Sequence, residues 1–327
     1  MLDNLVNGTS AHTHESQSGH QELQSHIFFI VYFVSISLVL AESVVGMQVM
    51  QAILILAALL AGHASQAIPS PAICKQGLVR RNTSQVARPA LGNVPYGVDI
   101  RSCTVTGKVA LTFDDGPWQY TEGLLDVLKA NDVKATFFVV GLNWDRDPNR
   151  GPIDDPATGY PATLRRMHDA GHQIGSHTWS HANLDTLTTE GRRDEILRNE
   201  DAFARVLGFF PTYLRPPFTA CGAQCVADIG QLGYHVANYD VDTKDFNGDY
   251  EYARAVFRDN VSLRSPQDSS HIVLAHDVWE GTVHGLAQFM IDEARTAGYQ
   301  LITLGECLGD PAANWYRDAR TGEAWRG

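Results

Sequence analysis

Residues 111–117 read Leu-Thr-Phe-Asp-Asp-Gly-Pro, and the rest of the chain is organised around them. The preceding run, Lys108–Leu111, is mostly apolar between polar neighbours, which predicts a short buried strand. The Gly-Pro pair favours a turn, so this strand ends on the adjacent carboxylates of Asp114 and Asp115. Two such acids repel each other, and a metal ion or an arginine is the usual partner that offsets the repulsion. Alone, the same residues also suit an ordinary polar turn.

Length and composition describe a globular protein. The chain has 327 residues, enough for one large domain or two of ordinary size. Hydrophobic residues make up 44% and charged residues 19%, which is typical of a chain with a sizeable core. The formal net charge of −12 argues against a nucleic-acid binder, which would carry a basic face. We therefore expect a neutral or cationic partner and no nucleic acid.

The N-terminal part of the chain is first polar and then strongly apolar. Residues 1–26 are expected to be disordered. Residues 27–61 exceed the roughly 20 residues that span a bilayer, so a membrane anchor is one interpretation. The other is a signal peptide over residues 47–67, with a small-residue cleavage site at residues 65–67. Residues 1–46 are then an extra leader or follow from a misassigned start.

Both interpretations place the body of the protein outside the cell. It is secreted or held in the cell wall in the signal-peptide interpretation, and a membrane-anchored ectodomain in the other. Residues 68–102 are expected to be a linker or propeptide. The sequences beginning at Asn82 and Asn260 are acceptors for N-glycosylation and agree with export.

The chain has five cysteines, an odd number. Cys103 and Cys307 bracket the main domain, and a disulfide bond between them would tie its two ends together. Cys221 and Cys225 could close a small loop. A zinc knuckle is the alternative for that pair, but it needs two more ligands, and the nearby sequence offers none. Cys74 is left over.

From Cys103 onward, short apolar runs alternate with amphipathic stretches. Strands are expected at residues 109–113, 135–140, 173–176, 213–215, 234–238, 272–275 and 300–303, and helices at 122–131, 162–170, 190–207, 250–260 and 283–297. This alternation predicts an α/β fold, a distorted (β/α) barrel of about seven parallel strands. We expect one catalytic domain over residues 103–310 and a C-terminal tail over 311–327.

Polar residues follow five of the predicted strands, where parallel barrels carry their functional groups. They are Asp114 and Asp115 after the first strand, His177 and His181 after the third, Arg215 after the fourth, Asp245 after the fifth and His276 after the sixth. On one helical turn, the imidazoles of the His-x3-His pair face the same way. Two imidazoles and one carboxylate are typical of a catalytic divalent metal site with an open position, whereas an isolated pair would suit helix capping or core packing.

Five short motifs occur in order along the chain: Thr-Phe-Asp-Asp-Gly-Pro at 112–117, His-x3-His at 177–181, Arg-Pro-Pro-Phe at 215–218, Asp-Thr-Lys-Asp-Phe at 242–246 and Leu-Ala-His at 274–276. This set resembles the five motifs of the polysaccharide deacetylases, the family 4 carbohydrate esterases with a NodB homology domain. The resemblance covers about residues 103–316. It is closest to secreted fungal chitin deacetylases, whose final stretch is similar to residues 305–310 and 314–316.

The resemblance implies a role for each residue at the metal. Asp115, His177 and His181 would be the metal ligands, with zinc as the expected ion and cobalt or manganese as alternatives. The metal would lower the pKa of bound water and polarise the acetamide carbonyl. Asp114 would be the catalytic base, and Arg215 would hold it in place.

The resemblance also implies the groups that serve the leaving amine and the acetyl group. His276 would protonate the amine, and Asp245 would orient His276 and raise its pKa. The backbone N–H of Phe218 would help to stabilise the oxyanion. Leu274 and Phe246 would form an apolar wall for the acetyl methyl group. The family often has Trp at the position of Phe246 and Tyr at that of Phe218; the first difference bears on substrate preference.

The expected reaction is hydrolytic N-deacetylation of N-acetylglucosamine units in chitin or its oligomers, which releases acetate and gives chitosan. Acetyl xylan esterase and peptidoglycan deacetylase are alternatives on the same fold. A non-catalytic carbohydrate-binding wall protein would be recognised by loss of the base or the acid, yet Asp114 and His276 are both present. We expect a monomer that contacts a membrane only if the apolar leader is retained.

Overall fold

The computed structural model describes residues 82–142 and 151–327. The predicted leader, signal peptide or anchor, the first part of the predicted linker and Cys74 lie outside the described residues. Within the described ranges, no helix has the length and apolar character needed to cross a membrane.

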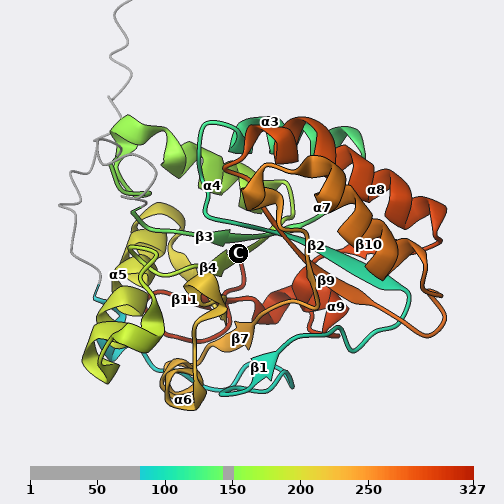
Figure 1. Ribbon diagram of the computed structural model, residues 1–327. Coiled ribbons are helices and arrows are strands. Elements are labelled where there is room, and N and C mark those ends of the chain that lie inside the picture. The colour runs from blue at the N-terminus through green and yellow to red at the C-terminus, as the bar shows by residue number, and fades with distance from the viewer. Residues whose placement is uncertain (1–81, 143–150) are drawn as a thin grey trace, which may run out of the picture. The chain divides into compact units, whose positions relative to one another are not determined.

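The strands are β1 (Asp99–Ile100), β2 (Lys108–Asp114), β3 (Thr136–Val139), β4 (Gln173–Ser176), β5 (Phe209–Pro211), β6 (Tyr213–Leu214), β7 (His235–Ala237), β8 (Val241–Asp242), β9 (His271–His276), β10 (Gln300–Ile302) and β11 (Tyr316–Asp318). Nine of them form one sheet in the order β1-β7-β6-β4-β3-β2-β9-β8, with β10 beside β2 (Figure 1). All pairs of this sheet are parallel, and β5 and β11 form a separate antiparallel pair. Because the order has two ends, the sheet is a curled half-barrel, which confirms the predicted distorted (β/α) barrel.

The helices are α3 (Thr121–Ala130), α4 (Tyr160–Asp169), α5 (Thr189–Leu207), α6 (Ala223–Gln231), α7 (Tyr250–Phe257), α8 (Ala287–Thr296) and α9 (Leu304–Cys307). They lie around the strands in Figure 1. Helix α3 shows how they form: three leucines of one face are buried, and Glu122 and Lys129 lie at the ends where the helix dipole favours their charges. Helix α5 begins at the capping side chain of Thr188 and ends at Gly208, whose φ is +85°.

The seven predicted strands correspond to β2, β3, β4, β6, β7, β9 and β10, and the five predicted helices to α3, α4, α5, α7 and α8. Two predicted helices include π-helical turns, at Arg258–Ser262 after α7 and at Thr282–Leu286 before α8. Strands β1, β5, β8 and β11 and helices α6 and α9 were not predicted. Each of these strands has two or three residues, too few for a hydrophobic pattern to develop.

The described fold extends beyond residues 103–310 in both directions. On the N-terminal side, β1 pairs with β7, and Arg88 forms an ion pair of 2.8 Å with the buried Glu200. On the C-terminal side, β11 pairs with β5. Arg317 is fully buried and donates a hydrogen bond of 2.7 Å to the carbonyl of Pro89. Parts of the predicted linker and tail therefore pack against each other and against the half-barrel.

Both predicted cysteine pairs are disulfide bonds in the structure. Cys103, just before β2, is joined to Cys307 on α9, with 5.0 Å between their Cα atoms. Cys221 is joined to Cys225 at the start of α6. The second bond removes the zinc-knuckle alternative, because both sulfur atoms are used.

Candidate active site

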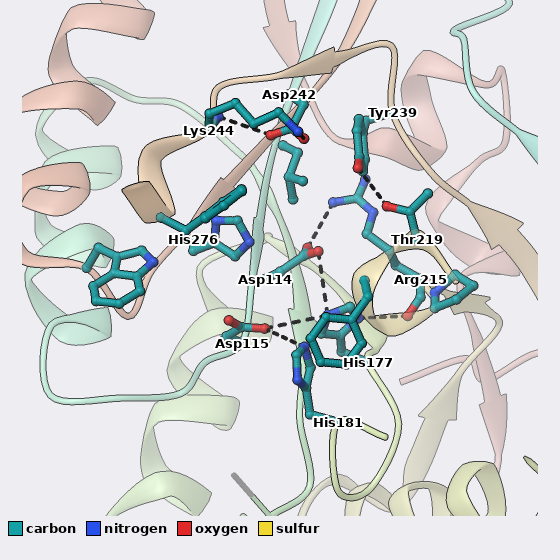
Figure 2. Close-up of a pocket in the computed structure, with 15 residues that line it drawn as sticks. Asp114, Asp115, His177, His181, Arg215, Thr219, Tyr239, Asp242, Lys244 and His276 are labelled. Carbon is teal, nitrogen blue, oxygen red and sulfur yellow. Dashed lines mark hydrogen bonds and ion pairs between the residues drawn. The ribbon is translucent and has the colours of Figure 1, made fainter. Parts of the chain in front are cut away.

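The predicted functional side chains meet at the carboxyl ends of neighbouring strands (Figure 2). Asp114 ends β2, His276 ends β9, and the sheet register places these two residues side by side. They line a cavity of about 490 Å³. Its other walls are Asp115, His177, His181, Arg215, Pro216, Phe218, Thr219, Tyr239, Asp242, Lys244, Phe246, Leu274 and Trp279. Of the predicted site residues, Asp245 does not line the cavity and lies behind His276.

The turn after β2 aims its two carboxylates in different directions. Asp115 has a φ of +79°, in the left-handed region, and the Gly116-Pro117 peptide bond is cis. A Cβ atom on Gly116 would lie 2.0 Å from Oδ2 of Asp277, so the buried Asp277 leaves no room there for a side chain. The Asp-Asp-Gly-Pro sequence therefore fits this turn for steric reasons.

The predicted helical turn at His177 and His181 is wrong. These residues lie in an irregular loop after β4, in which Thr178 and His181 have φ values of +70° and +57°. The loop nevertheless brings the two imidazoles together, with ring centroids 5.1 Å apart. The spacing therefore predicted the correct pair of histidines, although the segment that carries them is not helical.

Asp115, His177 and His181 form a cluster that can hold a metal ion. Oδ1 of Asp115 lies 3.5 Å from Nε2 of His177 and 3.2 Å from Nε2 of His181. Candidate ligand atoms of all three residues lie within 4.8 Å of one another. Figure 2 shows the three side chains pointing toward one point. Two imidazole nitrogens and one carboxylate oxygen are a donor set that suits a catalytic divalent metal.

The environment of His177 prepares it as a neutral ligand. Its Nδ1 lies 2.7 Å from the carbonyl oxygen of Arg215, which can only accept, so Nδ1 carries the proton and Nε2 keeps its lone pair. Burial lowers the pKa of His177 to about 4. The opposite holds for Asp115, where burial acts to raise the pKa but the hydrogen bond from His181 and the nearby histidine charges hold it well below its usual value. His177 as a neutral imidazole and Asp115 as a carboxylate therefore have the protonation states that metal ligands require.

Asp114 lies beside this cluster and is bound by Arg215. Nη1 of Arg215 donates a hydrogen bond of 2.8 Å to Oδ1 of Asp114, and both side chains are buried. The guanidinium plane also packs on the ring of Phe138, 4.2 Å from its centroid. Oδ2 of Asp114 lies 3.7 Å from Nε2 of His177. One carboxylate oxygen is therefore held by the arginine, and the other lies at the cluster.

His276 and Asp245 form a second coupled pair. Nδ1 of His276 lies 2.6 Å from Oδ1 of Asp245, and the backbone N–H of His276 donates to Oδ2 at 2.8 Å. Thr282 also donates to Oδ2, at 2.7 Å. Burial alone would lower the pKa of His276, but the hydrogen bond and charge of Asp245, with the charges of Asp115 and Asp114, raise it to about 9. The free Nε2 is the ring nitrogen left for proton transfer.

Apolar side chains close the cavity above these groups. Leu274 is 6% exposed, whereas Phe246 and Phe218 are 44% and 64% exposed at the rim. The ring of Phe246 meets that of His276 edge-on, with 5.8 Å between centroids. The backbone N–H of Phe218 donates no hydrogen bond within the described part of the chain.

Sequence reasoning gave no role to five polar or aromatic residues that line the cavity, one of which is Asp242 at the end of β8. Thr219, Tyr239 and Lys244 follow β6, β7 and β8, and Trp279 follows β9. Each lies within a few residues of a predicted strand end or motif. Because functional groups of parallel barrels follow the ends of the strands, that signal could have found them. Asp242 and Lys244 lie within the motif at 242–246, and the other three belong to no motif.

Comparisons with known proteins identify the family of this chain. Residues 101–237 match the family model described as "Polysaccharide deacetylase". A chitin deacetylase of Colletotrichum lindemuthianum is 43% identical over 239 residues, which cover 72% of this chain and 92% of the relative. This chain belongs to the polysaccharide deacetylase family. A second chitin deacetylase, from a Pestalotiopsis species, is 43% identical over 225 residues, which cover 69% of this chain and 72% of the relative.

Solved structures give the same result. The structure of the chitin deacetylase from the fungal pathogen Colletotrichum lindemuthianum superimposes with a TM-score of 0.65, over 69% of this chain and 97% of that one. The Bc1960 peptidoglycan N-acetylglucosamine deacetylase, 27% identical, superimposes with a TM-score of 0.55 over 66% of this chain and 94% of that one. Polysaccharide deacetylases are metal-dependent, and in this member the Asp-His-His cluster has a donor set that can bind a metal ion.

Proposed function

We propose that this protein is a chitin deacetylase, which hydrolyses the acetamide of N-acetylglucosamine units in chitin or its oligomers. The products are acetate and glucosamine units, as in chitosan. The observation that carries the proposal is that one cavity is lined by a three-ligand cluster, by Asp114 with its partner Arg215, and by His276, which Asp245 binds from behind. The identity of 43% with two chitin deacetylases supports the choice of substrate.

Asp115, His177 and His181 would hold the metal. When bound, a divalent ion acts there as a Lewis acid that makes water more acidic and polarises a carbonyl group. The mixed nitrogen and oxygen donors favour zinc, with cobalt and manganese as alternatives. Because His177 is fixed by the carbonyl of Arg215, its ligating nitrogen is oriented before an ion arrives.

Asp114 is the proposed general base. Arg215 occupies Oδ1, which leaves Oδ2 to accept a proton from the attacking water. Arg215 thereby fixes the orientation of the carboxylate toward the metal cluster, which a general base requires. General acid–base steps of this kind contribute about 10²–10⁴-fold each.

His276 is the proposed general acid. An amine is a poor leaving group unless its nitrogen is protonated, and Nε2 of His276 would supply that proton. Asp245 binds Nδ1 and so fixes which nitrogen faces the cavity. With its pKa raised to about 9, His276 carries the proton at neutral pH.

Phe218 would serve through its backbone. The N–H of this residue has no partner within the described residues, so it is free to donate to the oxygen on which negative charge develops. Leu274 and Phe246 would contact the acetyl methyl group. The half-exposed Phe246 is the wall residue best placed to affect which acetylated sugar is accepted.

We also propose that the protein works outside the cell or in the cell wall, as a monomer, after removal of residues 47–67 as a signal peptide. The sequence of that segment and the two acceptors for N-glycosylation support export. An ectodomain anchored by the apolar leader is the alternative.

Acetate release from chitin oligomers tests the reaction, with the chain from residue 68 onward, with and without a chelator. Asp114→Asn should abolish release, whereas Asp169→Asn, which removes a carboxylate 78% exposed at the surface, should not. Release that the chelator prevents and added zinc restores would support the proposal. Peptidoglycan and acetylated xylan run in parallel: release from either, but not from chitin oligomers, would contradict the substrate and keep the mechanism.

A further inference from the structure

The loop after β6 holds two residues in a costly backbone conformation. Phe218 and Thr219 both have a φ of +58°, in the left-handed region that residues other than glycine seldom adopt. Such conformations persist where surrounding contacts fix them. The direction of the Phe218 N–H depends on this conformation, because that N–H has no partner of its own within the described residues.

One contact that fixes the loop comes from the neighbouring strand. The hydroxyl groups of Thr219 and Tyr239 lie 2.6 Å apart, the dashed contact at the right of Figure 2. Tyr239 follows β7, which pairs directly with β6. Both residues line the cavity. The hydrogen bond therefore joins the loops that follow two adjacent strands, one residue away from Phe218.

Tyr239 is itself held by Arg215. Its ring lies 5.5 Å from the guanidinium carbon (Figure 2), and the guanidinium donates to the carbonyls of Ala237 and Asn238, just before Tyr239. The same guanidinium binds Asp114. The guanidinium of Arg215 therefore holds both Asp114, the proposed base, and Tyr239. The hydroxyl of Tyr239 in turn binds Thr219, in the loop that carries Phe218.

We propose that Tyr239 is a positioning residue for the oxyanion donor. Its hydroxyl holds Thr219, and through Thr219 it keeps the Phe218 N–H aimed at the developing negative charge. This inference rests on the proposed function, which takes that N–H as the donor. Loss of an oxyanion donor costs about 10²–10³-fold in kcat. A variant in which this N–H is present but no longer held in the right direction should lose less, about tenfold in kcat.

Two substitutions remove the bond from either side. Tyr239→Phe keeps the ring over Arg215 and removes only the hydroxyl, and Thr219→Val keeps the shape of Thr219. Each should lower kcat about tenfold and leave KM within about twofold. Thr219→Ser, which retains the hydroxyl, should be close to wild type. The double variant should be no slower than either single variant, because both remove the same bond.

A second substrate distinguishes a misdirected Phe218 N–H from a general loss of packing in Tyr239→Phe. The oxyanion formed from an N-trifluoroacetyl group is a weaker base than that from an acetyl group, so it depends less on a hydrogen-bond donor. The loss in Tyr239→Phe should therefore shrink on N-trifluoroacetyl oligomers, whereas a packing defect would lower both rates equally. Tyr252→Phe, which removes a hydroxyl from a residue 52% exposed on α7, is the matched control and should change neither rate.

Three results would overturn the inference: unchanged kcat in Tyr239→Phe, a change in KM alone, or additive losses in the double variant. The second would mean that the Tyr239 hydroxyl binds substrate, and the third that the hydroxyls act separately. A wild-type chain that works on xylan or peptidoglycan instead of chitin would contradict only the proposed substrate, and the series would then be measured there. A wild-type chain that releases no acetate from any of the three would overturn both proposals.

Discussion

Arg215 and Asp114 are joined by a hydrogen bond of 2.8 Å between side chains that are 1% and 4% exposed. The same guanidinium donates to the hydroxyl of Thr112 and to the carbonyls of Ala237 and Asn238. One arginine after β6 therefore binds the end of β2 and the end of β7. A charge in so enclosed a place is tolerated because each of the three guanidinium nitrogens donates at least one hydrogen bond.

The first prediction concerns this pair. Arg215→Met keeps much of the side-chain length but leaves Asp114 buried without its counter-ion and two carbonyls without a donor. Removing one partner of a buried pair costs about 3–5 kcal/mol of unfolding free energy. Denaturant unfolding measures the loss, and acetate release should fall with it because Asp114, the proposed base, loses the donor that holds its Oδ1 in place. Arg320→Met, at a side chain 76% exposed, is the control and should stay within about 0.5 kcal/mol of wild type.

Much of the half-barrel could be predicted because its central strands are continuous apolar runs. β2 and β9 are buried along nearly their whole length, and such runs differ clearly from the amphipathic helices between them. The functional side chains follow those strands, so their grouping at one edge of the sheet could also be predicted. The two-residue strands β1 and β8 carry too little pattern to be found from sequence.

The parts of the site that escaped prediction depend on contacts between loops. The hydrogen bond between Thr219 and Tyr239 joins residues twenty positions apart, and neither belongs to a motif. The predicted conformation of the loop that carries His177 was wrong for a related reason. Spacing in a sequence indicates which residues can meet, but the left-handed conformations of Thr178 and His181 are selected by packing around the cavity.

The second prediction concerns the pH dependence set by His276. In the proposed mechanism protonated His276 is the active form, and with the pKa of His276 raised to about 9 that form is lost only as the pH rises through about 9. Burial acts to lower this pKa and Asp245 is the largest group that raises it, so Asp245→Asn should move the alkaline limb of kcat well below pH 9.

Asp240→Asn is the matched control for that experiment. Asp240 makes a similar contact of 2.7 Å with Nδ1 of His271, and neither residue lines the cavity. The alkaline limb of kcat in Asp240→Asn should stay at the position seen in the wild type. A limb that does not move in Asp245→Asn would show that another group supplies the proton to the amine.

The third prediction tests the turn that carries the paired carboxylates. Gly116→Ala would place a Cβ atom 2.0 Å from Oδ2 of Asp277, which is buried and accepts a hydrogen bond of 2.5 Å from Thr121. Since Asp277 cannot withdraw without losing that bond, the turn should shift. We expect a loss of about 1–3 kcal/mol in unfolding free energy and a large loss of acetate release.

Gly123→Ala provides the comparison for this substitution. Gly123 lies in helix α3, and its nearest neighbour to an added Cβ is Val283 at an ordinary 3.4 Å. Alanine is favoured over glycine in a helix by up to about 1 kcal/mol, so this variant should be as stable as wild type or more so. Equal losses in both variants, measured by denaturant unfolding, would contradict the steric account of Gly116.

The fourth prediction compares the two disulfide bonds, which close loops of very different length. The bond of Cys103 to Cys307 spans 204 positions and that of Cys221 to Cys225 spans 4. In the chain-entropy model a cross-link stabilises by restricting the unfolded chain, by about 5 kcal/mol for the long loop and about 2 kcal/mol for the short one. Paired Cys→Ser replacement of each bond, followed by denaturant unfolding, should therefore destabilise the protein more at Cys103 and Cys307. An equal or larger loss at the short loop would mean that the second bond acts through the folded state, by holding the start of α6 beside the loop that carries Phe218 and Thr219.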